Sequence, residues 1–390
     1  MIPKDPLKNV LVIDLSKKTF EKQERIDLFD QYLGGTGVGI QLLHEFAKPT
    51  VDPLGLENAI ILATGPLVGA FPMASKTVAM FKSPLTGNLG ESHAGGRSSV
   101  AIRSAGYGAI VITGKSELPV YVVVDENSVY FRDARALWGL PSSRQPRWAI
   151  AKREPNAGCR TILVTGPAGE RMVRYASVVS ESFRHFGRLG LGAVFGSKNL
   201  KALQIGGKRA VNVQNAGEYR KIYKSLYDRC LEPEFVAKYR QLGTPENLLP
   251  LNEIGALPTR NLTQAKFEAA ETISGEHFQH HFLARRVACS HCPVACVHLA
   301  ELREPYAQES YFNKTTLVSY DYELIYALGT MLGVGDPEQL LRLLIAVEDL
   351  GVDAISCGVS LAWATEAFQK GFITQKETLV SLKWGDATAY

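Results

Sequence analysis

The sequence lacks any uninterrupted apolar run long enough to cross a membrane, and its first six residues lack the basic segment and apolar core of a signal peptide. It also lacks blocks of like charge: the net charge is only +4, and the basic residues are interspersed with acidic ones. These absences argue against a membrane protein, a secreted protein and a nucleic-acid-binding protein. We therefore predict a cytoplasmic location, with no membrane and no nucleic acid among the partners.

Cysteine is scarce as well, with six residues in a chain of 390. Cys159, Cys230 and Cys357 are isolated in the sequence, so they do not form the disulfide framework of a small secreted domain. This cysteine usage predicts a reducing compartment. Hydrophobic residues make up 46% of the chain, which is enough for a substantial core, and the length predicts two or more domains.

The other three cysteines form a C-x2-C-x3-C run: Cys289, Cys292 and Cys296. Thiolates at such short spacing are typical ligands of an iron–sulfur cluster, although no fourth cysteine ligand is obvious. A zinc site of the Cys3His type is the alternative, with His291 or His298 as the fourth ligand. Redox-active thiols, or thiols without a role, are the third interpretation. Pro293 predicts a tight, non-helical loop, which suits either metal.

Glycine is abundant, with 35 residues, most of them in the first half. Residues 33–39 predict a glycine-rich turn that opens a helix, where exposed backbone N–H groups favour an anion. The pattern is not G-x-G-x-x-G and follows a poor candidate for a buried strand, so it does not predict dinucleotide binding. Further glycine motifs recur near five cationic side chains: Lys76, His93, Arg97, Arg184 and Arg188. Tight turns explain any one motif, but the repeated pairing predicts an anionic ligand held by backbone and cations.

Apolar runs predict a β-rich domain over residues 1–210, with strands that include residues 10–15, 58–64, 120–124, 128–131 and 173–179. Beyond it, helical periodicity predicts a mainly helical domain over residues 211–390, with a helix after Asp336 and another over residues 354–370. Residues 384–387 predict a further helix start just before the sequence ends. We therefore expect a truncated chain or one half of a larger protein.

Taken together, the motifs resemble the tungsten-containing aldehyde:ferredoxin oxidoreductase family over essentially residues 5–390. The motifs that carry the resemblance are the cysteine run and residues 34–37, 82–87, 92–96, 105–108, 166–170 and 187–201. The resemblance implies an α+β fold in which two β-sheets hold a tungsten bis-pterin of the molybdopterin type. It also implies helical domains that carry a [4Fe–4S] cluster, and a Mg²⁺ ion that bridges the pterin phosphates.

The resemblance also implies roles for individual residues. Cys289, Cys292 and Cys296 match three of the four cluster ligands, and Glu323 matches an active-site glutamate, with a raised pKa if it is buried. The remaining matches are to pterin and its magnesium ion: Lys76 and Arg184 to the phosphates, the backbone carbonyls of His93 and His185 to Mg²⁺, the motif residues Gly95, Gly96, Gly187 and Arg188 to the pterin, and Glu348 and Asp353 to an acidic pterin-binding turn. The family's second acidic turn, fourth cluster cysteine and active-site histidine have no match in this sequence.

The activity implied is oxidation of an aldehyde to a carboxylic acid, with electrons passing through the pterin and the cluster to ferredoxin or another iron–sulfur carrier. We expect a small aldehyde or aromatic substrate, and as further partner either a second copy in a homodimer or an additional electron-transfer subunit. Residues 1–390 alone are expected to be inactive. The alternatives are a tungsten-dependent aromatic acyl-CoA reductase of the same family, or a non-catalytic fragment or subunit with structural zinc.

Overall fold

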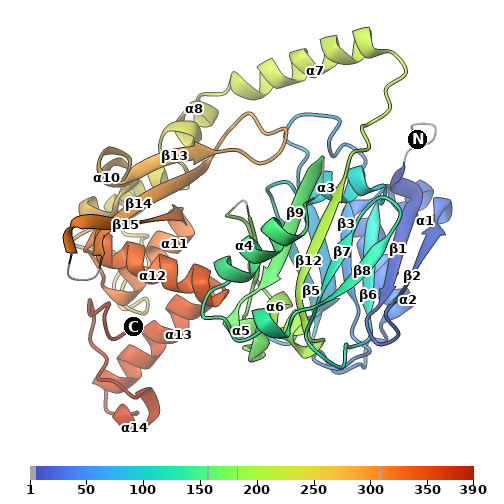
Figure 1. The fold of residues 1–390 in the computed structure, drawn as a ribbon. Coiled ribbons are helices and arrows are strands. Elements are labelled where there is room, and N and C mark those ends of the chain that lie inside the picture. The colour runs from blue at the N-terminus through green and yellow to red at the C-terminus, as the bar shows by residue number, and fades with distance from the viewer. Residues whose placement is uncertain (1–5, 156–157, 182, 307–308) are drawn as a thin grey trace. The chain divides into compact units, whose positions relative to one another are not determined.

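The computed structural model describes residues 6–155, 158–181, 183–306 and 309–390. The chain divides into two compact units (Figure 1). The first unit contains Met1–Arg229 and takes in two short later segments, Cys289–Pro293 and Asp349–Asp353. The second unit contains Cys230–Ala288, Val294–Glu348 and Ala354–Tyr390.

The first sheet of the first unit has six strands in the order β2-β1-β6-β3-β4-β5. Its strands are β1 (Asn9–Asp14), β2 (Thr19–Glu24), β3 (Ile60–Thr64), β4 (Thr77–Lys82), β5 (Leu89–Ala94) and β6 (Ala109–Thr113). Strands β1 and β6 are parallel, and the other neighbours are antiparallel. Consequently β5, which carries His93, is an edge strand.

The second sheet of this unit also has six strands, in the order β11-β10-β9-β12-β7-β8. Its strands are β7 (Val120–Val124), β8 (Val129–Asp133), β9 (Cys159–Thr165), β10 (Val178–Ser180), β11 (His185–Phe186) and β12 (Leu200–Gly207). Strands β7 and β12 are parallel, whereas the other pairs are antiparallel. The edge strand β11 contacts the edge strand β5 of the first sheet.

Apolar side chains of both sheets form one core, with Leu11 and Ile112 from the first sheet and Val122, Leu163 and Leu203 from the second. The residues that alternate with them point to the opposite faces. Helices α1 (Ile26–Tyr32) and α2 (Gly35–Phe46) cover the outer face of the first sheet, and α4 (Arg144–Arg153) packs on that of the second. Helices α3 (Ser98–Ala105), α5 (Pro167–Glu170) and α6 (Leu191–Ser197) also pack against strands of this unit, and α7 (Ala216–Leu231) follows β12 (Figure 1).

The second unit combines helices with a sheet that the sequence did not predict. Its helices are α8 (Glu234–Gln241), α9 (Leu248–Glu253), α10 (Gly275–His281), α11 (Tyr322–Leu328), α12 (Pro337–Leu350), α13 (Ala354–Gln369) and α14 (Gln375–Thr378). The last two residues of α12 belong to the first unit, because the second unit takes in this helix only as far as Glu348. The sheet has the order β13-β14-β15, with strands β13 (Leu283–Val287), β14 (Val297–Tyr306) and β15 (Glu309–Tyr320). Among the described residues, no helix is both long and apolar enough to span a membrane.

The predicted α+β class with two sheets in the first half is confirmed. Two local predictions are wrong. Of the predicted strand over residues 173–179, only Val178 and Val179 lie in a strand, β10 (Val178–Ser180). No helix begins at residue 384, because Gly385 adopts a left-handed φ of 85° and its N–H donates to the carbonyl of Leu332, which bends the chain.

A buried ion pair gives a test of the first unit. The ammonium group of Lys201 contacts the carboxylate of Glu170, with side-chain exposures of 0% and 5%. Burial lowers the pKa of Lys201, and the Glu170 carboxylate opposes this shift. We predict that Glu170→Gln lowers the free energy of unfolding by about 3 kcal/mol, because it leaves a buried charge without its counter-ion.

The measurement is urea-induced unfolding at neutral pH. The matched control replaces both Glu170 and Lys201 by Met, which removes both charges and is expected to cost less than the single substitution. Equal stability of Glu170→Gln and the parent protein would contradict the prediction.

Candidate functional site

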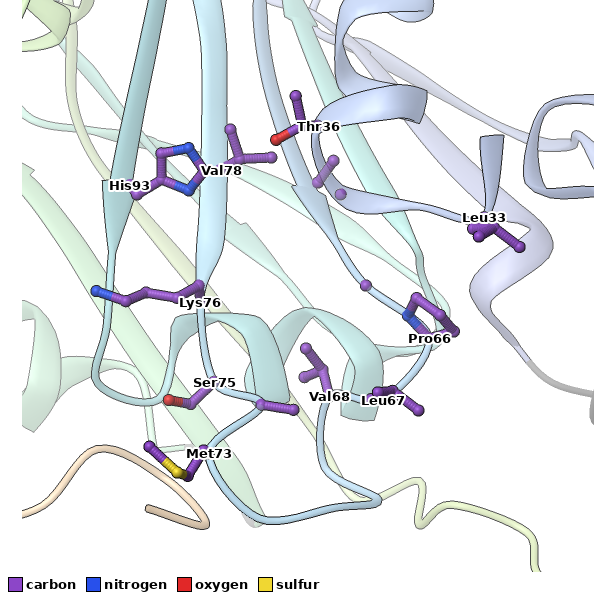
Figure 2. A pocket seen from close by; sticks show the side chains of 14 residues that line it. Leu33, Thr36, Pro66, Leu67, Val68, Met73, Ser75, Lys76, Val78 and His93 are labelled. Carbon is purple, nitrogen blue, oxygen red and sulfur yellow. The ribbon is translucent and has the colours of Figure 1, made fainter. Parts of the chain in front are cut away.

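A cavity of about 350 Å³ opens in the first unit at one end of the first sheet. Figure 2 shows Lys76, at the start of β4, and His93, on β5, at its wall. Other lining residues come from the turn before α2, the segment after β3 and the loop before β4, and include Leu33, Thr36, Pro66 and Met73. Segments distant in sequence thus converge on one cavity.

The cavity wall suits a flat ligand that carries negative charge. Helix α2 begins at Gly35 without a side-chain cap, so N–H groups of its first turn are open to a ligand. A Cβ atom added to Gly35 or Gly65 would meet no atom within 4 Å, which leaves room for the flat ring of a ligand against the backbone. Lys76 adds a cation, and the His93 ring is held 2.7 Å from the Glu91 carboxylate (Nε2 to Oε1).

The first half of the cysteine run belongs to the same unit and packs close to this cavity. The N–H of Ser290 donates to the carbonyl of Gly96 at 2.8 Å, and the N–H of Met73, a cavity residue, donates to the carbonyl of His291 at 3.0 Å. A Cβ on Gly95 would lie 2.8 Å from Sγ of Cys289. The loop is therefore held against the glycine turn that follows His93.

The thiols themselves lie on both sides of the unit boundary. Cys289 and Cys292 belong to the first unit, and a hydrogen bond of 3.0 Å from the N–H of Cys292 to the carbonyl of Cys289 closes a tight turn. Cys296 belongs to the second unit. Within the described part of the chain, no three His, Cys, Asp or Glu side chains are grouped as a metal site. A cluster or zinc at this run therefore stays a prediction.

Arg184 also lies beside the glycine turn. Its Nε would be 3.6 Å from a Cβ on Gly95, and its carbonyl accepts a hydrogen bond of 2.8 Å from Ser180 in the β10–β11 hairpin. His185, the next residue, is on edge strand β11, which contacts the edge strand β5 that carries His93. Gly187 and Arg188 follow directly, and a Cβ on Gly187 would meet no atom within 4 Å. Several residues that are predicted to bind phosphate or Mg²⁺ thus lie on adjoining elements.

The acidic turn predicted to bind pterin lies against the same unit. The N–H of Asp353 donates to the carbonyl of Tyr175 at 3.0 Å, and that of Ser177 donates to Gly351 at 2.8 Å. Asp349, which the sequence did not single out, anchors the turn through Ser142 (2.7 Å) and Arg144 (2.9 Å). Glu348, the last residue of the second unit before this turn, has a buried side chain.

Glu323, the predicted catalytic glutamate, lies in the first turn of α11 in the second unit. The Asp321 carboxylate caps this helix by accepting a hydrogen bond of 3.0 Å from the N–H of Leu324. The Glu323 side chain is exposed, so the burial considered from the sequence is not present in this unit. Its catalytic role stays a prediction.

Tyr320 is a polar group near Glu323 that the sequence did not indicate. It lies at the end of β15, its exposure is 1%, and its hydroxyl has no hydrogen-bond partner among the described residues. Burial raises the pKa of this phenol. In the sequence, the only signal for Tyr320 was its position at the end of a strand, directly before the residue that caps a helix.

The close approach of Gly95 to the cysteine loop can be tested directly. We predict that Gly95→Ala lowers the free energy of unfolding by about 1–3 kcal/mol, because the added methyl group must displace Cys289. Gly217→Ala, in the first turn of α7 where the nearest atom is 3.6 Å from a built Cβ, is the control and is expected to be neutral or slightly stabilising. Thermal unfolding of both variants measures the difference, and equal midpoints would refute the contact.

Two family models match the chain along most of its length. The aldehyde ferredoxin oxidoreductase N-terminal domain matches residues 10–207, and domains 2 and 3 of the same family match residues 221–390. The tungsten-containing aldehyde ferredoxin oxidoreductase of Pyrococcus horikoshii is 33% identical over 371 residues, which cover 94% of this chain and 59% of the relative. The WOR-like subunit of an aliphatic sulfonate oxidoreductase from Pyrococcus furiosus is 30% identical over 404 residues, 98% of this chain and 62% of the relative.

The fold also matches a solved structure, the active site complex BamBC of benzoyl coenzyme A reductase with 1,5-dienoyl-CoA. One of its chains matches with a TM-score of 0.77 at 24% identity, over 96% of this chain and 57% of that chain. This likeness concerns the fold alone. The chain thus spans about six tenths of the length of these proteins. The resemblance inferred from the motifs is confirmed: the chain belongs to the aldehyde ferredoxin oxidoreductase family.

Proposed function

We propose that this chain is the pterin-binding part of a tungsten oxidoreductase that converts an aldehyde to a carboxylic acid. In this reaction water supplies the oxygen atom, and the aldehyde and the water together release two electrons and two protons. A [4Fe–4S] cluster would carry the electrons on to ferredoxin or another iron–sulfur carrier. The observation that supports this function best is the contact of the Cys289–Pro293 loop with Gly95, Gly96 and Met73 beside the cavity.

The cavity fits the group that the family implies. A pterin is flat and carries a phosphate, and the cavity offers open glycine backbone, an uncapped helix start and the ammonium group of Lys76. When bound, tungsten bis-pterin supplies the two-electron redox chemistry. Lys76 and Arg184 would bind the phosphates, and the carbonyls of His93 and His185 would hold a Mg²⁺ ion. The surface against which the pterin lies would be formed by Gly95, Gly96, Gly187 and Arg188.

Acidic side chains would have two roles, to hold the pterin ring and to take up a proton from the substrate. Glu348 and Asp353 flank the turn fixed to Tyr175 and Ser177, where their carboxylates would accept hydrogen bonds from the pterin ring. Glu323 would take up the proton released from the substrate, which requires that its carboxylate be shielded from water in the complete site. Cys289, Cys292 and Cys296 would bind the cluster.

We also propose a cytoplasmic location and an iron–sulfur protein as partner. A cytoplasmic location suits thiols that must remain reduced to bind iron. The electron acceptor would be ferredoxin, with a second copy or an electron-transfer subunit as further partner.

The first test concerns the cofactor. Protein isolated anaerobically with the chains that accompany it is expected to contain tungsten and pterin, and to oxidise small aldehydes with a dye as electron acceptor. Arg184→Ala is expected to lower bound tungsten and pterin together, since it removes a charge-assisted hydrogen bond to phosphate. Metal and pterin analysis measures both.

The control for this test is Arg135→Ala, which removes an exposed arginine that pairs with Asp133. Full tungsten and pterin in Arg184→Ala would refute the role of that residue. Tungsten without aldehyde oxidation would favour reduction of an aromatic acyl-CoA, and zinc alone would favour the non-catalytic alternative.

The second test concerns the cysteine run. Cys292→Ala is expected to abolish the visible absorption of the anaerobically purified protein and its bound iron, because a cubane cluster needs each of its thiolate ligands. Cys230→Ala, a change in an isolated cysteine, is the matched control. Unchanged iron content in Cys292→Ala would argue decisively against the cluster.

A further inference from the structure

We propose that α7 (Ala216–Leu231) is the docking helix for an acidic, one-electron carrier protein, which sits on its aromatic and basic surface beside the Cys289–Pro293 loop. This inference rests on the proposed function, because it assumes that electrons leave through the cysteine run. The docking surface consists of three tyrosines, two aliphatic residues and two cations beside them: Tyr219, Ile222, Tyr223, Leu226, Tyr227, Arg220 and Lys224.

Helix α7 has no buried residue although it is 16 residues long. Its apolar side chains are nevertheless spaced as for one face of a helix, with Ile222 and Leu226 exposed by 44% and 36%. Helices of this length gain most of their stability from packing of such a face. The exposed face is therefore suited to a partner.

The tyrosines form a continuous row that reaches the cysteine loop. Tyr223 lies between Tyr219 and Tyr227, with ring centroids 5.9 Å and 6.3 Å away. Tyr219 is fixed to the first unit through the ring of Phe71 at 5.9 Å and a hydrogen bond from its hydroxyl to the carbonyl of Ala70. The Tyr223 hydroxyl lies 3.3 Å from Nδ1 of His291, and His291 stands between Cys289 and Cys292 in the sequence. A protein bound on this row would be next to two of the predicted cluster ligands.

The charge of α7 indicates the chemistry of the partner. The helix carries four cations and only two carboxylates, Glu218 and Asp228, and Asp228 is already paired with Lys224 at 2.6 Å. A basic helix steers an acidic protein into contact and fixes its orientation. Tyrosine and arginine are also enriched at the centres of protein interfaces. Electron-transfer encounters bury little area, below about 1,200 Å² in total, which a helix of this size and its surroundings can supply.

The same charge argues against a second copy as the occupant. In a two-fold contact through this surface the helix would meet itself, and Arg220 and Lys224 would face the same cations. Like charges at an interface cost binding free energy. An acidic carrier removes this cost.

The test is the binding of a recombinant acidic [4Fe–4S] ferredoxin to the isolated protein, measured by calorimetry at about 50 mM salt. The variant Arg220→Glu is expected to raise the Kd about fivefold or more, and the effect should shrink at about 500 mM salt because added ions screen the charges. A glutamate at position 220 can pair with Lys224, so the helix keeps its support. Tyr227→Ala is expected to raise the Kd at both salt concentrations, because it removes contact area rather than charge.

The matched control is Lys22→Glu, which makes the same change in charge at an exposed lysine of β2. Equal ferredoxin affinity of the α7 and control variants would overturn the docking surface. Self-association that disappears in the α7 variant would also overturn it, in favour of a second copy. Aldehyde oxidation with a small dye reports separately on the proposed function, and the α7 variant is expected to keep it unchanged.

Discussion

Close backbone contact at glycines determines how later parts of the chain join the β-rich unit. Residues 289–293 fit against Gly95, where any side chain would collide with Sγ of Cys289. Residues 349–353 fit against Gly166, where a Cβ would overlap the carbonyl of Leu350. The Leu350 carbonyl belongs to the main chain and cannot rotate away, and the Cys289 thiol would have to leave its position beside Gly95. The predicted cluster loop and the predicted acidic turn therefore depend on two positions without side chains.

A second constraint is the burial of charge between the sheets. Lys198 and Lys201 are fully buried, although they belong to residues 187–201, one of the motifs that carry the family resemblance. Lys198 donates to the carbonyls of Leu56 and Gly114 at 3.0 Å and 2.8 Å, and burial lowers its pKa to about 8. Lys201 pairs with Glu170. These lysines hold loops and strands in place, so part of this motif has a structural role in this chain, and the predicted ligand cations are those of the cavity and the glycine turn.

The sequence predicted most local structure of the first unit and little of its long-range arrangement. Runs of Ile, Val and Leu identified β3 and β7, because β-branched residues favour strands and these strands are buried on both faces. The parallel pairing of β1 with β6 joins residues about a hundred positions apart, which no local pattern encodes. Strands β14 and β15 were missed because charged and polar residues interrupt their apolar pattern.

The candidate site shows the same division between local and long-range information. Spacing predicted the three cysteines as cluster ligands, and glycine motifs predicted an anion site near Lys76 and His93, two residues that line the cavity. The convergence of Met73, Gly95 and Arg184 on the cysteine loop depends on the order of the strands and could not be predicted locally. Burial of Glu323 was also undetermined, because α11 buries Ile325 and Leu328 and turns the glutamate away from that face.

The shared contacts also connect the two predicted cofactors thermodynamically. Gly96 accepts a hydrogen bond from Ser290 of the cysteine loop, and Met73 both lines the cavity and donates to His291. A ligand that orders this cavity would therefore order the loop, and metal bound by the loop would in turn order the cavity wall. Each group then lowers the conformational entropy that the other must remove on binding, and by linkage the two affinities rise together. The arrangement favours a protein in which pterin and cluster are acquired cooperatively, with the glycine turn as the structural element that both sites share.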